Sequence, residues 1–159
     1  MLGLIAALDV GPQKKAELRA AGTQRAIAVA IGKRVFAHDL PAQVLKIRVD
    51  GAGRHTIAGV TISGVKFKHP IDASDLTAEV ATVVRDAFAA TAVEEVDVWA
   101  TVPMAQPPKT VVSGEYAQPT SRTVYSATVV RGDIPKLDAL LKGTRAIYWA
   151  EDFRAGLRR

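Results

Sequence analysis

The most regular hydrophobic pattern in the chain runs from about residue 72 to residue 90. Apolar residues recur there at steps of three and four, which gathers them on one side of an α-helix. They are Leu76, Val80, Val83, Val84, Ala87 and Phe88. Asp72 or Ser74 can accept hydrogen bonds from the free N–H groups of the first turn. We predict a helix from Asp72 to Ala90 whose apolar side packs on a sheet or on another helix.

Alternation of apolar and polar residues predicts five strands. They span Gln43–Val49, His55–Phe67, Glu94–Val102, Arg122–Arg131 and Ala146–Trp149. The residues between the first two strands (50–53, Asp-Gly-Ala-Gly) favour a turn, so these two strands should form a hairpin. Within the second strand the apolar parity changes between Ile62 and Val65. An extra residue near Ser63 and Gly64 would restore it, which predicts a β-bulge there.

Two further segments favour helix. Pro12–Phe36 is rich in good helix formers and has proline at its first position. A shorter helix should begin after Asp133 and stop at Gly143. From residue 55 onward the order of elements is β-α-β-β-α-β, the split βαβ pattern called ferredoxin-like. We therefore predict an α+β, ferredoxin-like sandwich with two helices on one face of a four-stranded antiparallel sheet, plus an added N-terminal helix and an extra hairpin strand.

The length and composition indicate one globular domain. A chain of 159 residues, 48% of them hydrophobic, can bury a core without metals or disulfides. We assign residues 12–159 to a single α+β domain and residues 1–11 to a separate apolar N-terminal segment. The absence of cysteine excludes a disulfide scaffold, a thiol nucleophile and a cysteine-ligated metal.

The apolar N-terminal segment bears on the compartment. Met1–Leu8 is too short to cross a bilayer, which takes about 20 residues, and we expect no membrane span. It resembles the second half of the hydrophobic region of a signal peptide, but without preceding positive residues. We interpret it as a remnant of an export signal, which favours a periplasmic or secreted protein. The alternative is an ordinary apolar terminus of a cytoplasmic protein.

The charge is unevenly distributed along the chain. Residues 1–71 hold 11 Lys and Arg against 4 Asp and Glu, whereas residues 72–159 hold 10 against 12. Four of the basic residues fall on the predicted hairpin: Lys46, Arg48, Lys66 and Lys68. Cations grouped in this way can neutralise phosphates, so a cytosolic RNA- or DNA-binding domain is one hypothesis. The strand 122–131 offers only Tyr125 for base stacking and lacks the RNP1 pattern, which weakens it.

Catalytic and cofactor motifs are absent from the sequence. It contains no G-x-S-x-G, no G-x-x-x-x-G-K-[ST] and no G-x-G-x-x-G. The three histidines lie on separate elements and lack the spacing of a metal site; they are His38, His55 and His69. We expect no metal and no cofactor.

A pair of carboxylates offers the one enzymatic alternative. Glu95 and Asp97 lie two residues apart on one predicted strand, in line with Trp99. Two acids beside an aromatic ring could support acid/base chemistry, as in a small carbohydrate-processing enzyme. A strand that faces solvent produces the same pattern, so we lean against an enzyme.

The connection 103–120 is the best candidate for a contact with another protein. Loops this long inside a small domain tend to carry function, and its prolines limit its freedom. The candidate protein-binding residues are Met104, Lys109, Val111, Val112 and Tyr116. In the alternative interpretation the loop folds back, and Tyr116 and Val112 cover Trp99.

These observations together favour a non-enzymatic binding or assembly module of the cell envelope. It would act through protein contacts, with itself or with another protein, at an open sheet edge or at the 103–120 loop. Nucleic-acid binding through the basic hairpin is the second hypothesis, and the carboxylate enzyme is the third.

Overall fold

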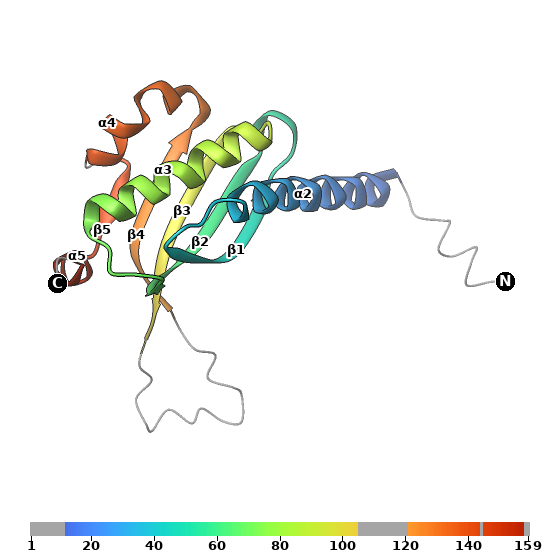
Figure 1. The fold of residues 1–159 in the computed structure, drawn as a ribbon. Coiled ribbons are helices and arrows are strands. Elements are labelled where there is room, and N and C mark those ends of the chain that lie inside the picture. The colour runs from blue at the N-terminus through green and yellow to red at the C-terminus, as the bar shows by residue number, and fades with distance from the viewer. Residues whose placement is uncertain (1–11, 105–120, 144, 158–159) are drawn as a thin grey trace, which may run out of the picture.

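The computed structural model describes residues 12–104, 121–143 and 145–157 and shows one five-stranded sheet flanked by helices (Figure 1). In chain order the elements are α2 (Pro12–Phe36), β1 (Ala42–Asp50), the 3₁₀ helix η1 (Gly53–His55), β2 (Ile57–Phe67), α3 (Ala73–Ala90), β3 (Glu95–Pro103), β4 (Ser121–Val130), the 3₁₀ helix η2 (Arg131–Lys136), α4 (Leu137–Lys142), β5 (Ile147–Trp149) and α5 (Glu151–Gly156). The predicted α+β class is confirmed.

The strands lie in the sheet in the order in which they occur in the chain. The order is β1-β2-β3-β4-β5, with β2 and β3 parallel and the other neighbours antiparallel. The ferredoxin-like order is not confirmed. A split βαβ unit places another strand between its two parallel strands, whereas β2 and β3 pair directly, from Ile57–Glu95 to Ser63–Thr101. The sheet is therefore mixed, and α3 is the crossover between two adjacent strands.

The predicted hairpin and its bulge are confirmed. β1 and β2 pair along most of their length, but Val44 pairs with Ile62 while Ala42 pairs with Phe67. Two steps on β1 therefore correspond to five on β2, a wider bulge than the single extra residue expected. The Ser63 side chain stabilises it, because its Oγ accepts hydrogen bonds from the backbone N–H groups of Val65 (3.2 Å) and Lys66 (3.1 Å).

The core lies between one face of the sheet and the helices α2 and α3, which both cross that face (Figure 1). Alternate residues of the central strands point into it. They are Ala58, Val60 and Ile62 of β2, Val96, Val98 and Ala100 of β3, and Tyr125, Ala127 and Val129 of β4. The predicted apolar stripe of α3 meets them and is buried. Fully burying one such Val or Leu contributes about 1.5–3 kcal/mol before entropy is subtracted, so this contact dominates the stability.

The N-terminus of α3 is capped by side chains of its own first turn, as predicted. Asp72 Oδ1 accepts from Asp75 N at 2.7 Å, and Asp75 Oδ2 accepts from Asp72 N at 3.1 Å. This reciprocal capping box satisfies two donors that the helix itself leaves free.

Helix α2 runs unbroken for 25 residues. Ile31 and Val35, near its C-terminal end, are buried in the core. The N-terminal half of the helix extends past the edge of the sheet (Figure 1). Gln24, near the middle of the helix, donates from Nε2 to the Gly51 carbonyl oxygen at 2.8 Å, so contacts with the body of the domain hold the C-terminal half.

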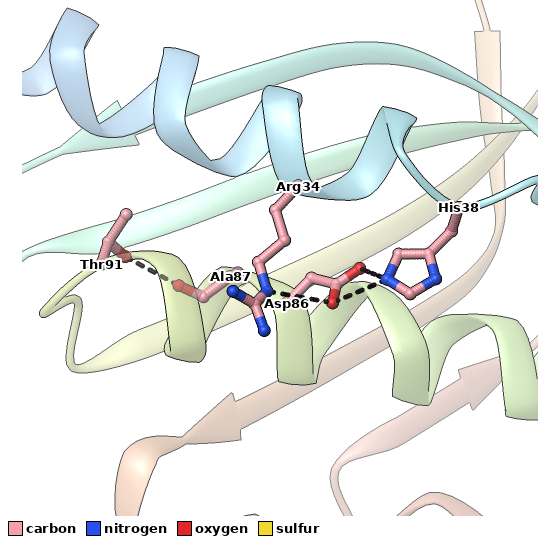
Figure 2. Close-up of polar contacts among 5 residues, drawn as sticks. All are labelled: Arg34, His38, Asp86, Ala87 and Thr91. Carbon is pink, nitrogen blue, oxygen red and sulfur yellow. Dashed lines mark hydrogen bonds and ion pairs between the residues drawn. The ribbon is translucent and has the colours of Figure 1, made fainter.

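A single carboxylate on α3 clamps the C-terminal end of α2 (Figure 2). Asp86 lies 3.5 Å from Arg34 Nε and 3.0 Å from His38 Nε2, and its side chain is only 9% exposed. At the C-terminal end of α3, Thr91 Oγ1 donates to the Ala87 carbonyl oxygen at 2.8 Å (Figure 2). The clamp fixes where α2 ends and where the chain turns toward β1.

A second buried acid on α3 holds the start of β1. Glu79 Oε1 accepts a hydrogen bond from Ala42 N at 2.8 Å, while Oε2 is buried without a hydrogen-bond partner among the described residues. Burial raises the pKa of Glu79 above its usual range, because the charged form loses its water; the bond from Ala42 opposes this in part.

Replacing Asp86 tests the clamp. We expect Asp86→Ala to lower the free energy of unfolding by about 1–2 kcal/mol, because a largely buried carboxylate with two partners is lost. Asp138→Ala is the matched control, since it removes an exposed ion pair between Asp138 of α4 and Arg85 of α3 and should change stability by less than about 1 kcal/mol. Urea denaturation compares the three proteins, and equal losses in the two variants would contradict the assignment.

The buried acid should make stability depend on pH. A raised pKa means that the folded state holds the proton more tightly, so the contribution of Glu79 is most favourable below about pH 4.5 and declines as the pH rises through the folded pKa. Glu79→Gln keeps an oxygen acceptor for Ala42 and carries no charge. We expect it to be more stable than the parent at about pH 7, with the difference shrinking toward pH 4. A difference in unfolding free energy that does not vary with pH would refute this.

Candidate binding surfaces

An apolar groove lies between α2 and the outer edge of the sheet. Strand β1 is the first strand of the sheet and has no strand on its outer side within the described part of the chain. The groove encloses about 590 Å³ between this strand and the helix. Three large apolar side chains stand exposed along it: Val29 (49%), Phe36 (67%) and Leu45 (50%). We call this surface the edge groove.

The charged residues that line the edge groove are all cations. They are Arg25 and Lys33 from α2 and Lys46 from β1. Gly32 lies at the floor of the groove and has no side chain to fill it. A Cβ atom built there would be 3.5 Å from Ile47 Cδ1, an ordinary contact distance. The edge groove thus combines exposed apolar side chains, positive charge and a strand whose outer backbone groups are unpaired by any described strand.

The face of the sheet opposite α3 carries a second surface. Residues paired across neighbouring strands point to the same face. One row on this face runs Lys46, Thr61, Trp99, Ser126 and Tyr148, from β1 to β5. The row places an aromatic ring at the centre of the sheet and another at its far side, with the small Ser126 between them.

The indole ring of Trp99 meets the backbone of β2 with its Cζ3–Cη2 edge. A Cβ atom at Gly59 would be only 2.6 Å from Trp99 Cζ3 and 3.1 Å from Cη2. Glycine at this position therefore makes room for the indole ring. The ring borders a groove of about 730 Å³, which also contacts Lys46, Lys66 and the hydroxyls of Thr61, Ser63 and Thr101. We call this surface the open-face groove.

The four basic residues singled out on the hairpin do not form one cluster. Lys46 and Lys66 both line the open-face groove. Arg48 is engaged with Asp50, at 3.2 Å between Nε and Oδ2. Lys68 is ion-paired with Asp39, and its backbone N–H donates to the Pro41 carbonyl oxygen at 2.9 Å. Lys66 and Lys68 both line a neighbouring pocket beside the end of α2, but Lys68 does not reach the open-face groove.

The two strand carboxylates do lie together on the open face. Burial raises the pKa of Glu95, and the neighbouring charge of Asp97 and a hydrogen bond between the two side chains raise it further. One oxygen of Asp97 is buried without a hydrogen-bond partner in the described structure. Their neighbours in adjacent strands are Ile57, Gly59, Thr128 and Val130, of which Thr128 alone carries a reactive group, a hydroxyl.

The predicted protein-binding loop falls almost entirely outside the described residues. Met104 is exposed at the end of β3. Lys109, Val111, Val112 and Tyr116 lie in the segment 105–120, so the loop contact and the alternative in which the loop covers Trp99 both stay predictions.

The histidines are dispersed, as their sequence positions suggested. His38 belongs to the Asp86 clamp, His55 ends η1, and His69 Nδ1 lies 3.1 Å from the Pro70 carbonyl oxygen. No group of three or more potential metal ligands occurs in the residues that the structure describes. Among the described helices, none has the length and apolar character needed to cross a membrane.

Sequence reasoning missed the edge groove. Val29 and Phe36 lie seven residues apart, on one side of α2. They are the large apolar residues that the core leaves exposed in the described part of this helix. Their spacing could have revealed a second stripe beside the buried one formed with Ile31 and Val35. The sequence does not distinguish this second stripe from the buried one, because the whole helix is rich in alanine and its apolar pattern is diffuse.

The fit between Gly59 and Trp99 gives a direct test of the open-face geometry. Gly59→Ala should destabilise the domain by about 1–3 kcal/mol, because the indole ring must move away from the new methyl group. Alanine in a strand would otherwise be neutral or stabilising. Gly132→Ala is the control, since nothing lies within 4 Å of its Cβ position. Urea denaturation followed by tryptophan fluorescence measures both, and a stable Gly59→Ala variant with unchanged emission would contradict the structure.

Comparison with known proteins gives no further guide. The chain matches no protein-family model, no curated protein and no solved structure. Any function must therefore be argued from the two grooves themselves.

Proposed function

We propose that this chain is a non-enzymatic binding module that holds an extended segment of a partner protein in the edge groove. The observation that carries the proposal is the coincidence of Val29, Phe36 and Leu45, all exposed, beside a strand whose outer edge pairs with no described strand. A partner strand can pair with β1 while its alternate side chains enter the groove, which is the usual mode of strand addition.

The charge of the rim indicates the chemistry of the partner. Arg25, Lys33 and Lys46 border the groove, so acidic side chains on the bound segment would find complementary charge. A second copy of this chain is disfavoured, because pairing two β1 edges would bring these cations together. The proposed occupant is a segment of another protein in which apolar residues alternate with Asp or Glu.

Within the described residues, Glu95 and Asp97 lie side by side, and the strand positions paired with them offer the hydroxyl of Thr128 as the single further reactive group. A strand that faces solvent produces such a pair of acids without any catalytic role, which supports a binding function. The location of the module in the cell envelope stays a prediction, because residues 1–11 lie outside the described residues.

A peptide of alternating valine and glutamate, nine residues long to match β1, tests the mode of binding. We expect the peptide to bind the full chain and to slow hydrogen exchange of β1 amides. The same peptide with lysine in place of glutamate should bind at least tenfold more weakly.

Point variants test the surface. Phe36→Ser and Lys33→Glu should each weaken binding of the acidic peptide about tenfold, as expected for groups at the centre and rim of a small interface. Val130→Ser is the matched control, because Val130 is 44% exposed but lies on β4, away from the groove. Binding that survives both groove variants, or that fails equally in the control, would overturn the proposal.

A further inference from the structure

The open-face groove has a different chemistry from the edge groove and suggests a different ligand. Trp99 lines it, and the Cζ3–Cη2 edge of the indole ring abuts the backbone at Gly59. This contact holds the ring in one orientation, so a planar group that stacks on it would cost little side-chain freedom on binding. An aromatic ring fixed in a groove suits a planar group.

Around this ring the described lining residues carry positive charge and hydroxyl groups. Lys46 and Lys66 are the two charged groups, both on the β1–β2 side. The hydroxyls come from three strands: Thr61 and Ser63 of β2, Thr101 of β3, and Ser121 and Thr123 of β4. Lysine, serine and threonine are common partners of phosphate oxygens. Gln43, whose amide can read a base edge, and the apolar residues Leu45, Val65 and Pro103 complete the lining.

The charge on the open face is also polarised. Glu95 and Asp97 precede Trp99 on β3, while the groove extends from Trp99 toward Thr101 and Pro103 at the other end of the strand. The acids therefore lie on the side of the ring away from the groove. An anionic chain would be attracted to the groove end of the face and repelled from the other.

We propose that the open-face groove binds single-stranded nucleic acid, with a base stacked on Trp99 and neighbouring phosphates on Lys46 and Lys66. Stacking on an aromatic ring and phosphate contacts to lysine are the two terms that support sequence-tolerant binding of single strands. The site does not involve Val29 or Phe36, which belong to the edge groove alone. Leu45 and Lys46 line both grooves, and the test therefore uses Trp99 and Lys66.

The probe is a fluorescein-labelled oligothymidylate of 12 nucleotides, measured by fluorescence anisotropy with the full chain at low salt. We expect saturable binding with an affinity that falls as salt rises. Trp99→Leu should weaken it about tenfold or more, because the stacked base is lost. Lys66→Gln should weaken it and reduce the steepness of the salt dependence, because one phosphate contact is lost.

Three controls separate this site from general charge and from the edge groove. Lys68→Gln removes a lysine two residues from Lys66 that is paired with Asp39 instead of lining the groove, and it should leave binding within twofold. Phe36→Ser should also leave it unchanged, even if the peptide experiments fail. Inorganic polyphosphate, which has charge but no rings, should compete weakly and be insensitive to Trp99→Leu.

Several outcomes would overturn the proposal. They are the absence of binding at about 50 mM salt, equal losses in Lys66→Gln and Lys68→Gln, and polyphosphate binding as tightly as the oligonucleotide. Tighter, Trp99-dependent binding of the acidic polysaccharide alginate would assign the groove to carbohydrate instead. If Trp99→Leu fails to fold by circular dichroism, Lys66→Glu at an exposed position decides the question, because it should abolish binding without affecting the fold.

Discussion

The packing of α3 against the sheet is the contact on which the rest of this structure depends. The apolar stripe from Leu76 to Phe88 covers the central strands and is buried along its whole length. Because α3 connects two adjacent parallel strands, it also fixes the side of the sheet on which the core forms. Trp99 and its row of neighbours are left on the opposite face as a consequence. The open-face groove thus follows from where α3 lies.

The edge groove depends on the same helix through two buried acids. Asp86 holds the end of α2, and Glu79 holds the start of β1. The chain between these two points is short, so the helix and the strand are kept at a set separation. Phe36, at the end of α2, is left outside the core by this arrangement. Burying a carboxylate is unfavourable in itself, and here it positions a surface that the hydrophobic core alone would not define.

The two grooves meet at β1 and differ in what they can bind. Leu45 and Lys46 line both, because an outer strand presents its residues to the edge as well as to the face. The edge groove adds exposed apolar groups of α2, and the open-face groove adds hydroxyls and an indole ring. A strand-like ligand suits the first and a stacked, anionic ligand the second. A ligand in either groove would therefore contact a residue that borders the other.

The sequence by itself determined the local structure. Periodicity located α3 and the strands, Asp72 marked a helix start, and the parity change near Ser63 revealed the bulge, because each depends on neighbours along the chain. It also identified Lys46 and Lys66 as basic residues of one hairpin. The pairing of β2 with β3, the ion pair of Lys68 with Asp39 and the exposure of Phe36 come from the tertiary structure. Strand order and exposure depend on which distant segments exclude water from one another, and a local pattern is compatible with more than one such arrangement.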